Sequence, residues 1–304
     1  MLDKTLLEQV ISSVPSDMID EVVVAGGYKV DMIKSYFSKS DFDFDLTIVP
    51  EDEPLGTGGA LGNCRDVVNG TFACFNGDVI SSLDVKSLLS LHRSNGGIGT
   101  LGLWEVNDPT RFGIVGLDDN SKITRFMEKP KPEEVFSNLI NAGSYIFEDD
   151  IFDYIPSGRS SIERDVFPLL AEKQMLNGQK FDGFFIDSGT RSSWCDAVRT
   201  CIDNKRFSSG EICGKSWFDV PFGKVEEGST IIDSMVGKDT EIMHSVVENS
   251  TILSGTKVSK NVSIESCLIG KNVTIGKNSR LTNMIVGHGS IIPEDSILND
   301  GQWP

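Results

Sequence analysis

Two aspartates follow, in sequence, short apolar runs of the kind that form buried strands. Asp78 follows the run at residues 71–75 (TFACF), and Asp187 closes the run at residues 184–186 (FFI). In an open parallel sheet, ligands bind outside the carboxyl ends of the strands, and a carboxylate there suits Mg²⁺, which prefers oxygen ligands. An ordinary polar turn explains Asp78 equally well, because the Asn-Gly pair before it is common in turns. Sequence spacing leaves open whether the two carboxylates meet.

Two further segments carry residues that suit a sugar phosphate or a nucleotide. Residues 54–61 (PLGTGGAL) hold three glycines in four positions, which allows the backbone to approach a flat ligand closely. Residues 128–130 (EKP) offer a lysine for a phosphate and a glutamate that can accept hydrogen bonds from sugar hydroxyls. Taken alone, a loop that opens a helix and a surface ion pair before a proline are the simpler explanations of these segments.

The composition excludes several classes of function. The chain has 304 residues, enough for two domains, and a net charge of −17 with no basic stripe, so a nucleic-acid partner is not expected. Six cysteines without a Cys-x-x-Cys pair, and only three histidines, argue against a structural zinc site. There is no apolar run of the roughly 20 residues that span a bilayer, and from residues 1–8 we expect no signal peptide. We therefore expect a cytoplasmic protein without a membrane partner.

Helix-like and strand-like patterns alternate over the first 150 residues, which predicts a Rossmann-like α/β domain with a mixed, mainly parallel sheet. The expected strands are residues 21–25, 46–49, 71–75 and 99–106, and the expected helices are residues 6–14, 30–37 and 83–93. Residues 112–117 and 122–127 read as a hairpin across the turn-rich sequence DDNS.

Aliphatic residues recur every five or six positions from Val225 to Ile292. Every third one gives steps of 17, 16, 17 and 17 residues, so the pattern predicts a left-handed parallel β-helix of hexapeptide-type repeats with three strands per coil and about four coils. We expect an α/β domain at residues 1–207, a linker at 208–223 and the β-helix at 224–304. Stacked coils favour a homo-oligomer. An acyltransferase site at His244 or His288 is the less favoured alternative.

Read together and in order, the motifs closely resemble the sugar-phosphate nucleotidyltransferases, and among them the GDP-mannose pyrophosphorylases (mannose-1-phosphate guanylyltransferases). The matching segments are PLGTGGAL (54–61), FNGDVI (75–80), RFGIV (111–115), ITRFMEKPKP (123–132), NLINAGSYIF (138–147), SIERDVFP (161–168) and FDGFFIDSGT (181–190). The predicted β-helix fits as well, because many members of this family carry one.

The resemblance implies an activity and a set of roles. Such enzymes join a sugar 1-phosphate to a nucleoside triphosphate and release pyrophosphate, and the resemblance implies mannose 1-phosphate and GTP, with Mg²⁺. Asp78 and Asp187 would bind the metal, and Lys129 would act with them in catalysis. The remaining implied substrate-binding residues are Gly56, Thr57, Gly58 and Gly59 beside the nucleotide base, and Gly113, Glu128, Asn141 and Gly143 around the sugar phosphate.

One family feature lies outside this sequence. Family members open with a strand and a loop of the form G-G-x-G-T-R-x-x-P-x-T, followed by a Lys-Pro pair, which together hold the triphosphate. Met1 aligns just after that pair. The 304-residue chain is therefore expected to be weak or inactive, since one lost preorganised donor costs about 10²–10³ in rate. We favour an enzyme whose start lies further upstream. The alternative is an impaired paralogue that acts as a regulatory or assembly subunit of a full-length pyrophosphorylase.

Overall fold

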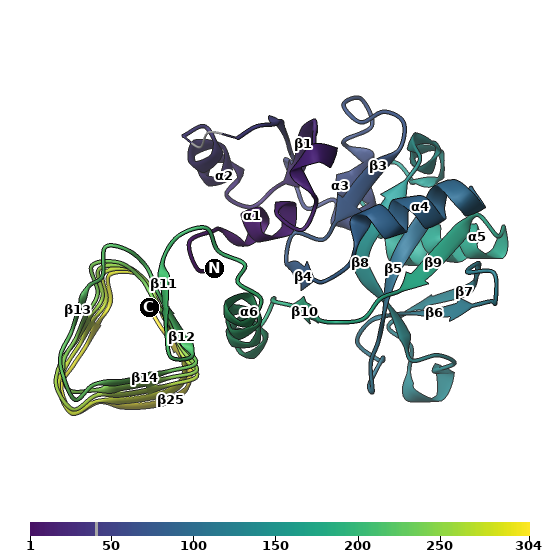
Figure 1. The fold of residues 1–304 in the computed structure, drawn as a ribbon. Coiled ribbons are helices and arrows are strands. Elements are labelled where there is room, and N and C mark those ends of the chain that lie inside the picture. Colours follow the sequence, from purple (N-terminus) through teal and green to yellow (C-terminus); the bar gives the residue numbers. More distant parts are fainter. Residues whose placement is uncertain (40–41) are drawn as a thin grey trace. The chain divides into compact units, whose positions relative to one another are not determined.

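The computed structural model describes residues 1–39 and 42–304, and the chain divides into two compact units (Figure 1). One unit is Ser12–Phe185, and the other joins Met1–Ile11 to Ile186–Pro304. In the part of the chain that is described, no helix has the length and apolar character needed to cross a membrane.

The Ser12–Phe185 unit is an α/β fold around a mixed six-stranded sheet of order β7-β6-β8-β5-β9, with β3 beside β8. Its strands are β1 (Glu21–Gly26), β2 (Asp45–Pro50), β3 (Phe72–Phe75), β4 (Val79–Ser81), β5 (Gly99–Glu105), β6 (Gly113–Leu117), β7 (Ile123–Glu128), β8 (Leu139–Phe147) and β9 (Leu176–Lys180). Its helices are α2 (Val30–Phe37), α3 (Gly56–Gly62), α4 (Val85–Asn95) and α5 (Phe167–Glu172), with 3₁₀ turns η1 (Ser16–Met18), η2 (Pro132–Glu134) and η3 (Asp149–Tyr154) and a π-helical turn η4 (Ile162–Val166).

The pairing explains how this sheet is mixed. β5 pairs with β9 in parallel, whereas β3, β5 and β6 pair antiparallel with β8, so this sheet is mixed with mostly antiparallel pairs and not mainly parallel as predicted. β1 and β2 pair in parallel as a separate two-stranded sheet. The hairpin predicted at 112–117 and 122–127 is β6 and β7. α4 packs against β5, β8 and β9, and α5 packs against β7 and β9. The largest buried cluster includes Leu101, Leu103, Ile123, Tyr145, Phe147, Phe167 and Leu170.

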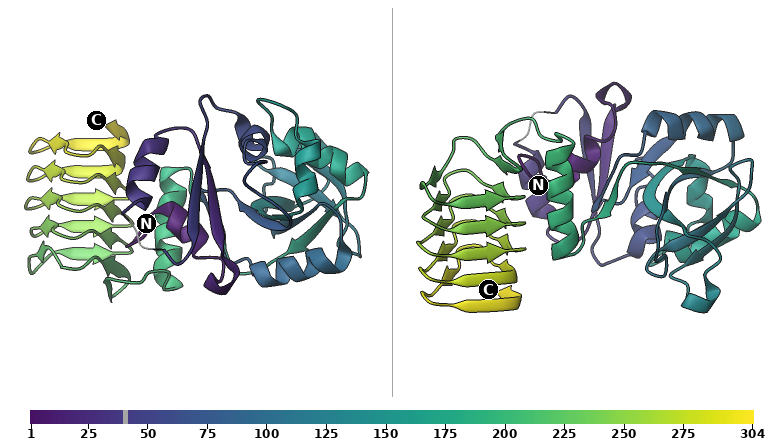
Figure 2. Two further views of the ribbon diagram at one scale, coloured as in Figure 1. Left: turned by 90° about the horizontal axis from the view of Figure 1, so that it is seen from above. Right: turned by 60° about the horizontal axis from the view of Figure 1, so that its bottom comes forward.

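The second unit contains the predicted parallel β-helix, whose stacked coils are seen from the side in Figure 2. One of its faces has five strands, so the helix has about five turns, one more than predicted from the four repeat intervals. Its elements are α1 (Leu6–Ile11), α6 (Arg191–Asp203), β11 (Glu211–Cys213), β12 (Ser216–Phe218), β13 (Lys224–Val225), β14 (Thr230–Ile232), β15 (Met235–Val236), β16 (Glu241–Ile242), β17 (Val246–Glu248), β18 (Thr251–Ile252), β19 (Lys257–Val258), β20 (Ser263–Glu265), β21 (Leu268–Ile269), β22 (Thr274–Ile275), β23 (Arg280–Val286), β24 (Ile291–Ile292) and β25 (Ile297–Trp303). The unit boundary falls within β10 (Phe185–Asp187).

The aliphatic repeat fills the interior of the β-helix. Ile242, Val258, Ile275 and Ile292 stand one coil apart in register on one face, and each is at most 1% exposed. Burying aliphatic side chains of this size stabilises the fold by about 1.5–3 kcal/mol each. The spacing predicted from the sequence is therefore the spacing of the stacked core.

Helix α6 is fastened to one face of the β-helix. The Trp194 indole N–H donates to Thr251 Oγ1 at 3.3 Å, and the Arg199 guanidinium donates to Asn249 Oδ1 at 2.8 Å. Arg191 donates to the Ser266 carbonyl. Since these bonds join a helix to three positions on the coils, α6 belongs structurally with the β-helix. A domain division at residues 208–223 stays a prediction.

Candidate functional site

The hairpin β6–β7 positions Glu128 opposite a glycine. Gly113 pairs with Glu128 across the two strands, and a Cβ on Gly113 would lie 2.9 Å from Glu128 Oε2 and 2.5 Å from the Phe126 ring. Only glycine leaves room there for the carboxylate. Lys129 follows with a left-handed φ of 47°, its N–H donates to the Phe112 carbonyl, and its Nζ lies 3.7 Å from Glu128 Oε1.

A bulge in β8 positions Asn141. The register between β5 and β8 shifts at this point, and Gly143 adopts a φ of 62°, which favours glycine. The Gly143 N–H donates to Asn141 Oδ1 at 3.1 Å, and Asn141 Nδ2 donates to the Tyr145 hydroxyl at 2.9 Å. A Cβ on Gly143 would lie 2.6 Å from Asn76 Nδ2. The bulge therefore fixes the orientation of the Asn141 amide.

The π-helical turn η4 contributes a residue that the sequence argument missed. Glu163 Oε2 accepts hydrogen bonds from Thr57 Oγ1 at 2.6 Å and from Ser161 Oγ at 2.7 Å. Thr57 Oγ1 in turn accepts the Ile162 N–H at 3.1 Å. π-Turns occur often at functional sites. The only signal in the sequence was an acidic residue within the motif at 161–168, to which no role was given.

Charge connects Glu163 with the hairpin. Burial raises the pKa of Glu128, whose side chain is 14% exposed, and the Glu163 carboxylate raises it further, while Lys129 and Arg164 oppose the shift. Burial, followed by the negative charge of Glu163, also raises the pKa of the Tyr145 phenol well above its usual value. The Ser12–Phe185 unit thus contains a set of interacting groups: the carboxylates of Glu128 and Glu163, the Tyr145 phenol, and the cations of Lys129 and Arg164. This set can accept hydrogen bonds from several hydroxyls and neutralise a phosphate.

The glycines of α3 have a packing role within the same unit. A Cβ on Gly56 would lie 2.5 Å from the Ser160 carbonyl oxygen, and a Cβ on Gly59 would lie 2.5 Å from the Gly158 carbonyl oxygen. A Cβ on Gly58 would lie 2.7 Å from Ser160 Oγ. The Gly58 N–H donates to the Ser160 carbonyl at 3.0 Å. Close approach of two backbones explains all three glycines. Their predicted position against a nucleotide base stays a prediction.

The two predicted metal ligands belong to different units. Asp78 is exposed and directly precedes β4, while Asp187 is exposed at the end of β10, where its Oδ1 accepts the Gly189 N–H at 3.0 Å. In residues 1–39 and 42–304 no group of three or more His, Cys, Asp and Glu side chains is arranged to hold a metal ion. That Asp78 and Asp187 share an ion stays a prediction.

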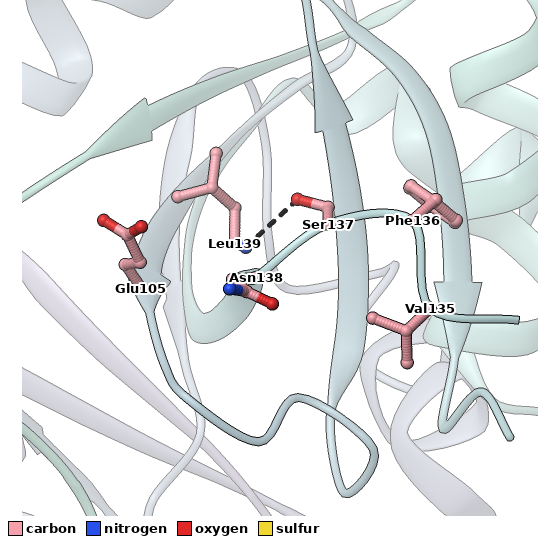
Figure 3. Close-up of a pocket in the computed structure, with 6 residues that line it drawn as sticks. All are labelled: Glu105, Val135, Phe136, Ser137, Asn138 and Leu139. Atoms are coloured by element: carbon pink, nitrogen blue, oxygen red, sulfur yellow. Dashed lines mark hydrogen bonds between the residues drawn. The ribbon is translucent and has the colours of Figure 1, made fainter. Parts of the chain in front are cut away.

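Figure 3 shows an open pocket of about 440 Å³ whose lining includes none of these residues. It is lined by Glu105, Val135, Phe136, Ser137, Asn138 and Leu139. Ser137 Oγ already accepts the Leu139 N–H at 3.1 Å, and Glu105 is paired with Lys180. No predicted site residue lines this pocket, and we assign it no role.

Comparison with known families supports the resemblance inferred from the sequence motifs and the predicted β-helix. Residues 1–204 match the family model of the nucleotidyl transferases, and residues 220–299 match that of the GlmU-like C-terminal hexapeptide. Together these two matches span both the α/β part of the chain and the β-helix.

Individual proteins similar to this chain carry related names. Mannose-1-phosphate guanylyltransferase 1 of Arabidopsis thaliana is 28% identical over 98% of this chain and 86% of its own length. The mannose-1-phosphate guanylyltransferase catalytic subunit beta of Drosophila melanogaster is 30% identical over 93% of this chain and 80% of its own. Among solved structures, HddC of Yersinia pseudotuberculosis is 25% identical with a TM-score of 0.52, covering 63% of this chain and 81% of that one.

Proposed function

This chain belongs to the nucleotidyl transferase family, and from that premise we propose that it joins a sugar 1-phosphate to a nucleoside triphosphate and releases pyrophosphate. Mannose 1-phosphate and GTP are the proposed pair, because relatives named mannose-1-phosphate guanylyltransferase match nearly the whole chain. The matches give no specific support to the alternative of an impaired regulatory subunit.

The arrangement around Glu128 is the observation that carries this proposal. Glu128 and Glu163 present carboxylate oxygens, and Lys129 stands beside Glu128 with a side chain that is 58% exposed. We assign the two glutamates to sugar hydroxyls and Lys129 to the phosphate. Asn141, held by Gly143 and Tyr145, adds an amide of fixed orientation.

The chemistry asks little of the protein beyond positioning. A phosphate oxygen of the sugar 1-phosphate attacks the α-phosphorus of the triphosphate, and pyrophosphate leaves. That oxygen is already charged, so no protein base or nucleophile is needed. Residues that orient the two phosphates and offset their charge then supply the rate enhancement. This agrees with a site built from Glu, Lys, Asn and Gly residues.

We propose Asp78 and Asp187 as ligands of Mg²⁺. Both side chains are exposed: Asp78 directly precedes β4, and Asp187 is the last residue of β10. Their carboxylate oxygens are hard donors of the kind that suits Mg²⁺. Mg²⁺ usually takes only one or two carboxylates and completes its shell with water and substrate phosphates, so two protein ligands suffice. When bound, the ion would neutralise charge on the phosphates.

Two further proposals concern the setting of the protein. We propose a homo-oligomer assembled through the β-helix, since the hexapeptide match places such a module at residues 220–299. We also propose a cytoplasmic location, supported by six cysteines that form no disulfide pattern in the sequence.

The test separates binding from turnover. Isothermal titration of the 304-residue chain with mannose 1-phosphate, glucose 1-phosphate and free mannose should show binding of a sugar phosphate that Lys129→Ala weakens. Lys86→Ala is the matched control, because Lys86 makes only an exposed ion pair with Asp17. Pyrophosphate release with GTP and Mg²⁺ is then measured on the protein isolated from its own cells. Binding without turnover there would favour the regulatory subunit, and the absence of both would defeat the proposal.

A further inference from the structure

Side-chain amides form ladders along the corners of the β-helix. Asn261 Nδ2 donates to Asn278 Oδ1 at 3.1 Å, and Asn278 Nδ2 donates to Asp295 Oδ1 at 2.8 Å. At another corner Asn283 Nδ2 donates to Asp300 Oδ1 at 2.8 Å. Asparagine both accepts from one coil and donates to the next, whereas an ionised aspartate only accepts. Both ladders therefore stop donating at the coil formed by residues 291–304.

Two backbone donors stop at the same coil. Gly276 and Gly287 each donate their N–H to a carbonyl of the following coil, at 2.9 and 2.8 Å. The register between coils places Pro293 and Pro304 in the equivalent positions one coil later. Proline has no N–H to donate. The sequence thus removes a donor at four positions of one coil, two on the backbone and two on side chains.

We propose that the face of the 291–304 coil that points away from the preceding coil is closed against stacking by a second copy of this chain. Edges of β-structure invite pairing with other chains, and proteins block them with charge and proline. Here a second copy would meet the carboxylates of Asp295 and Asp300 and would find no N–H at Pro293 and Pro304. Like charges from two copies would also repel one another. Assembly through the β-helix then uses its sides or its other end.

Three of the four positions, all except Pro304, can be reopened without disturbing the coil. Pro293→Gly, Asp295→Asn and Asp300→Asn each copy the residue found one coil earlier, at Gly276, Asn278 and Asn283. Asp295 and Asp300 have φ of 59° and 51°, a conformation that asparagine adopts readily. Folding should therefore be retained. The double variant D295N/D300N serves if the triple variant fails to fold.

Sedimentation velocity over a range of concentrations tests the proposal. The triple variant should form an additional, concentration-dependent species of twice the wild-type mass. The control D66N/D182N removes the same charge from two exposed positions of the Ser12–Phe185 unit and should sediment as the wild type. A triple variant that sediments as the wild type at every concentration overturns the proposal.

Cross-linking identifies the surface involved. Asn299→Cys is introduced into an exposed position of the same coil, with Cys213→Ser to remove the exposed native thiol. Under mild oxidation the triple variant should form a disulfide-linked dimer through residue 299, and the wild-type coil should not. A wild-type coil that cross-links as readily as the variant would also refute the proposed closure.

Discussion

Thr57 Oγ1 donates a 2.6 Å hydrogen bond to Glu163 Oε2 across 106 residues of sequence. The bond joins the start of α3 to the π-helical turn η4, and the same carboxylate oxygen also accepts the Ser161 hydroxyl. Glu163 is therefore held in one orientation, beside a second carboxylate whose pKa it raises. A site built in this way is preorganised for hydroxyl groups.

Replacing Glu163 with glutamine should weaken sugar 1-phosphate binding by about ten- to a hundredfold, because a charge-assisted hydrogen bond contributes about 1.5–3 kcal/mol. Titration calorimetry measures this, with Glu172→Gln as an exposed control on α5. A role limited to structure predicts no change in pH dependence. In contrast, loss of the Glu163 charge should lower the pKa of Glu128 and move the acid limb of the binding profile to lower pH.

Glu128→Gln should stabilise the protein at neutral pH while abolishing most sugar-phosphate binding. Burial raises the folded-state pKa of this acid, so the unfolded chain releases its proton first as pH rises. The free energy of unfolding therefore falls as the pH rises from the ordinary glutamate pKa of about 4.3 to the raised pKa of the folded state. Tm should rise at neutral pH, and the gain should vanish well below that lower pKa. An equal gain in Tm at neutral pH and at a pH well below the ordinary glutamate pKa would argue against ionisation of Glu128 as the cause.

Gly59→Ala should destabilise the Ser12–Phe185 unit by about 1–3 kcal/mol, because its Cβ would lie 2.5 Å from the Gly158 carbonyl oxygen. Gly77→Ala is the matched control, since nothing lies within 4 Å of a Cβ there, and its effect should stay within about 0.5 kcal/mol. Urea unfolding of the two variants gives the comparison. Equal stability of both would contradict the packing role of the α3 glycines.

Cys267→Ser should be tolerated and Cys267→Ala should cost about 1–3 kcal/mol. Cys267 Sγ donates to the Glu265 carbonyl and accepts the Met284 N–H, as the Ser250 hydroxyl does one coil earlier with its own neighbours. Burial raises the thiol pKa to about 11, so it keeps the proton that it donates. Alanine leaves a buried N–H without an acceptor. Thermal unfolding measures the stability of the two variants. Identical melting temperatures would exclude the Cys267 hydrogen bonds as a source of stability.

The β-helix was predictable because its signal is local and repeats. A buried aliphatic every five or six residues fixes both the strand positions and the coil period, so Ile242, Val258 and Ile275 could be assigned to the core from spacing alone. The number of turns was one too low, because four intervals separate five strands.

The hairpin at residues 112–117 and 122–127 was predictable, whereas the roles of the predicted site residues stay predictions. Glu128 and Gly113 face each other across a hairpin whose two strands are close in sequence, and pairing them needed no long-range information. The packing of α3 on residues 158–160 and the bond from Thr57 to Glu163 join segments about a hundred residues apart. Without that contact, the glycines resemble a ligand-binding loop and Glu163 has no visible role.

The unit that holds the β-helix is interrupted in sequence by the whole of residues 12–185. Gln9 Nε2 donates to the Arg206 carbonyl at 2.9 Å, and Arg206 returns a bond to the Gln9 carbonyl, across 197 residues. Because domains generally fold as they are synthesised, the α/β unit can form on the ribosome while residues 1–11 still wait for α6. Residues 1–11 thus stay without these partners, and open to chaperones and proteases, until residues 186–206 have been synthesised.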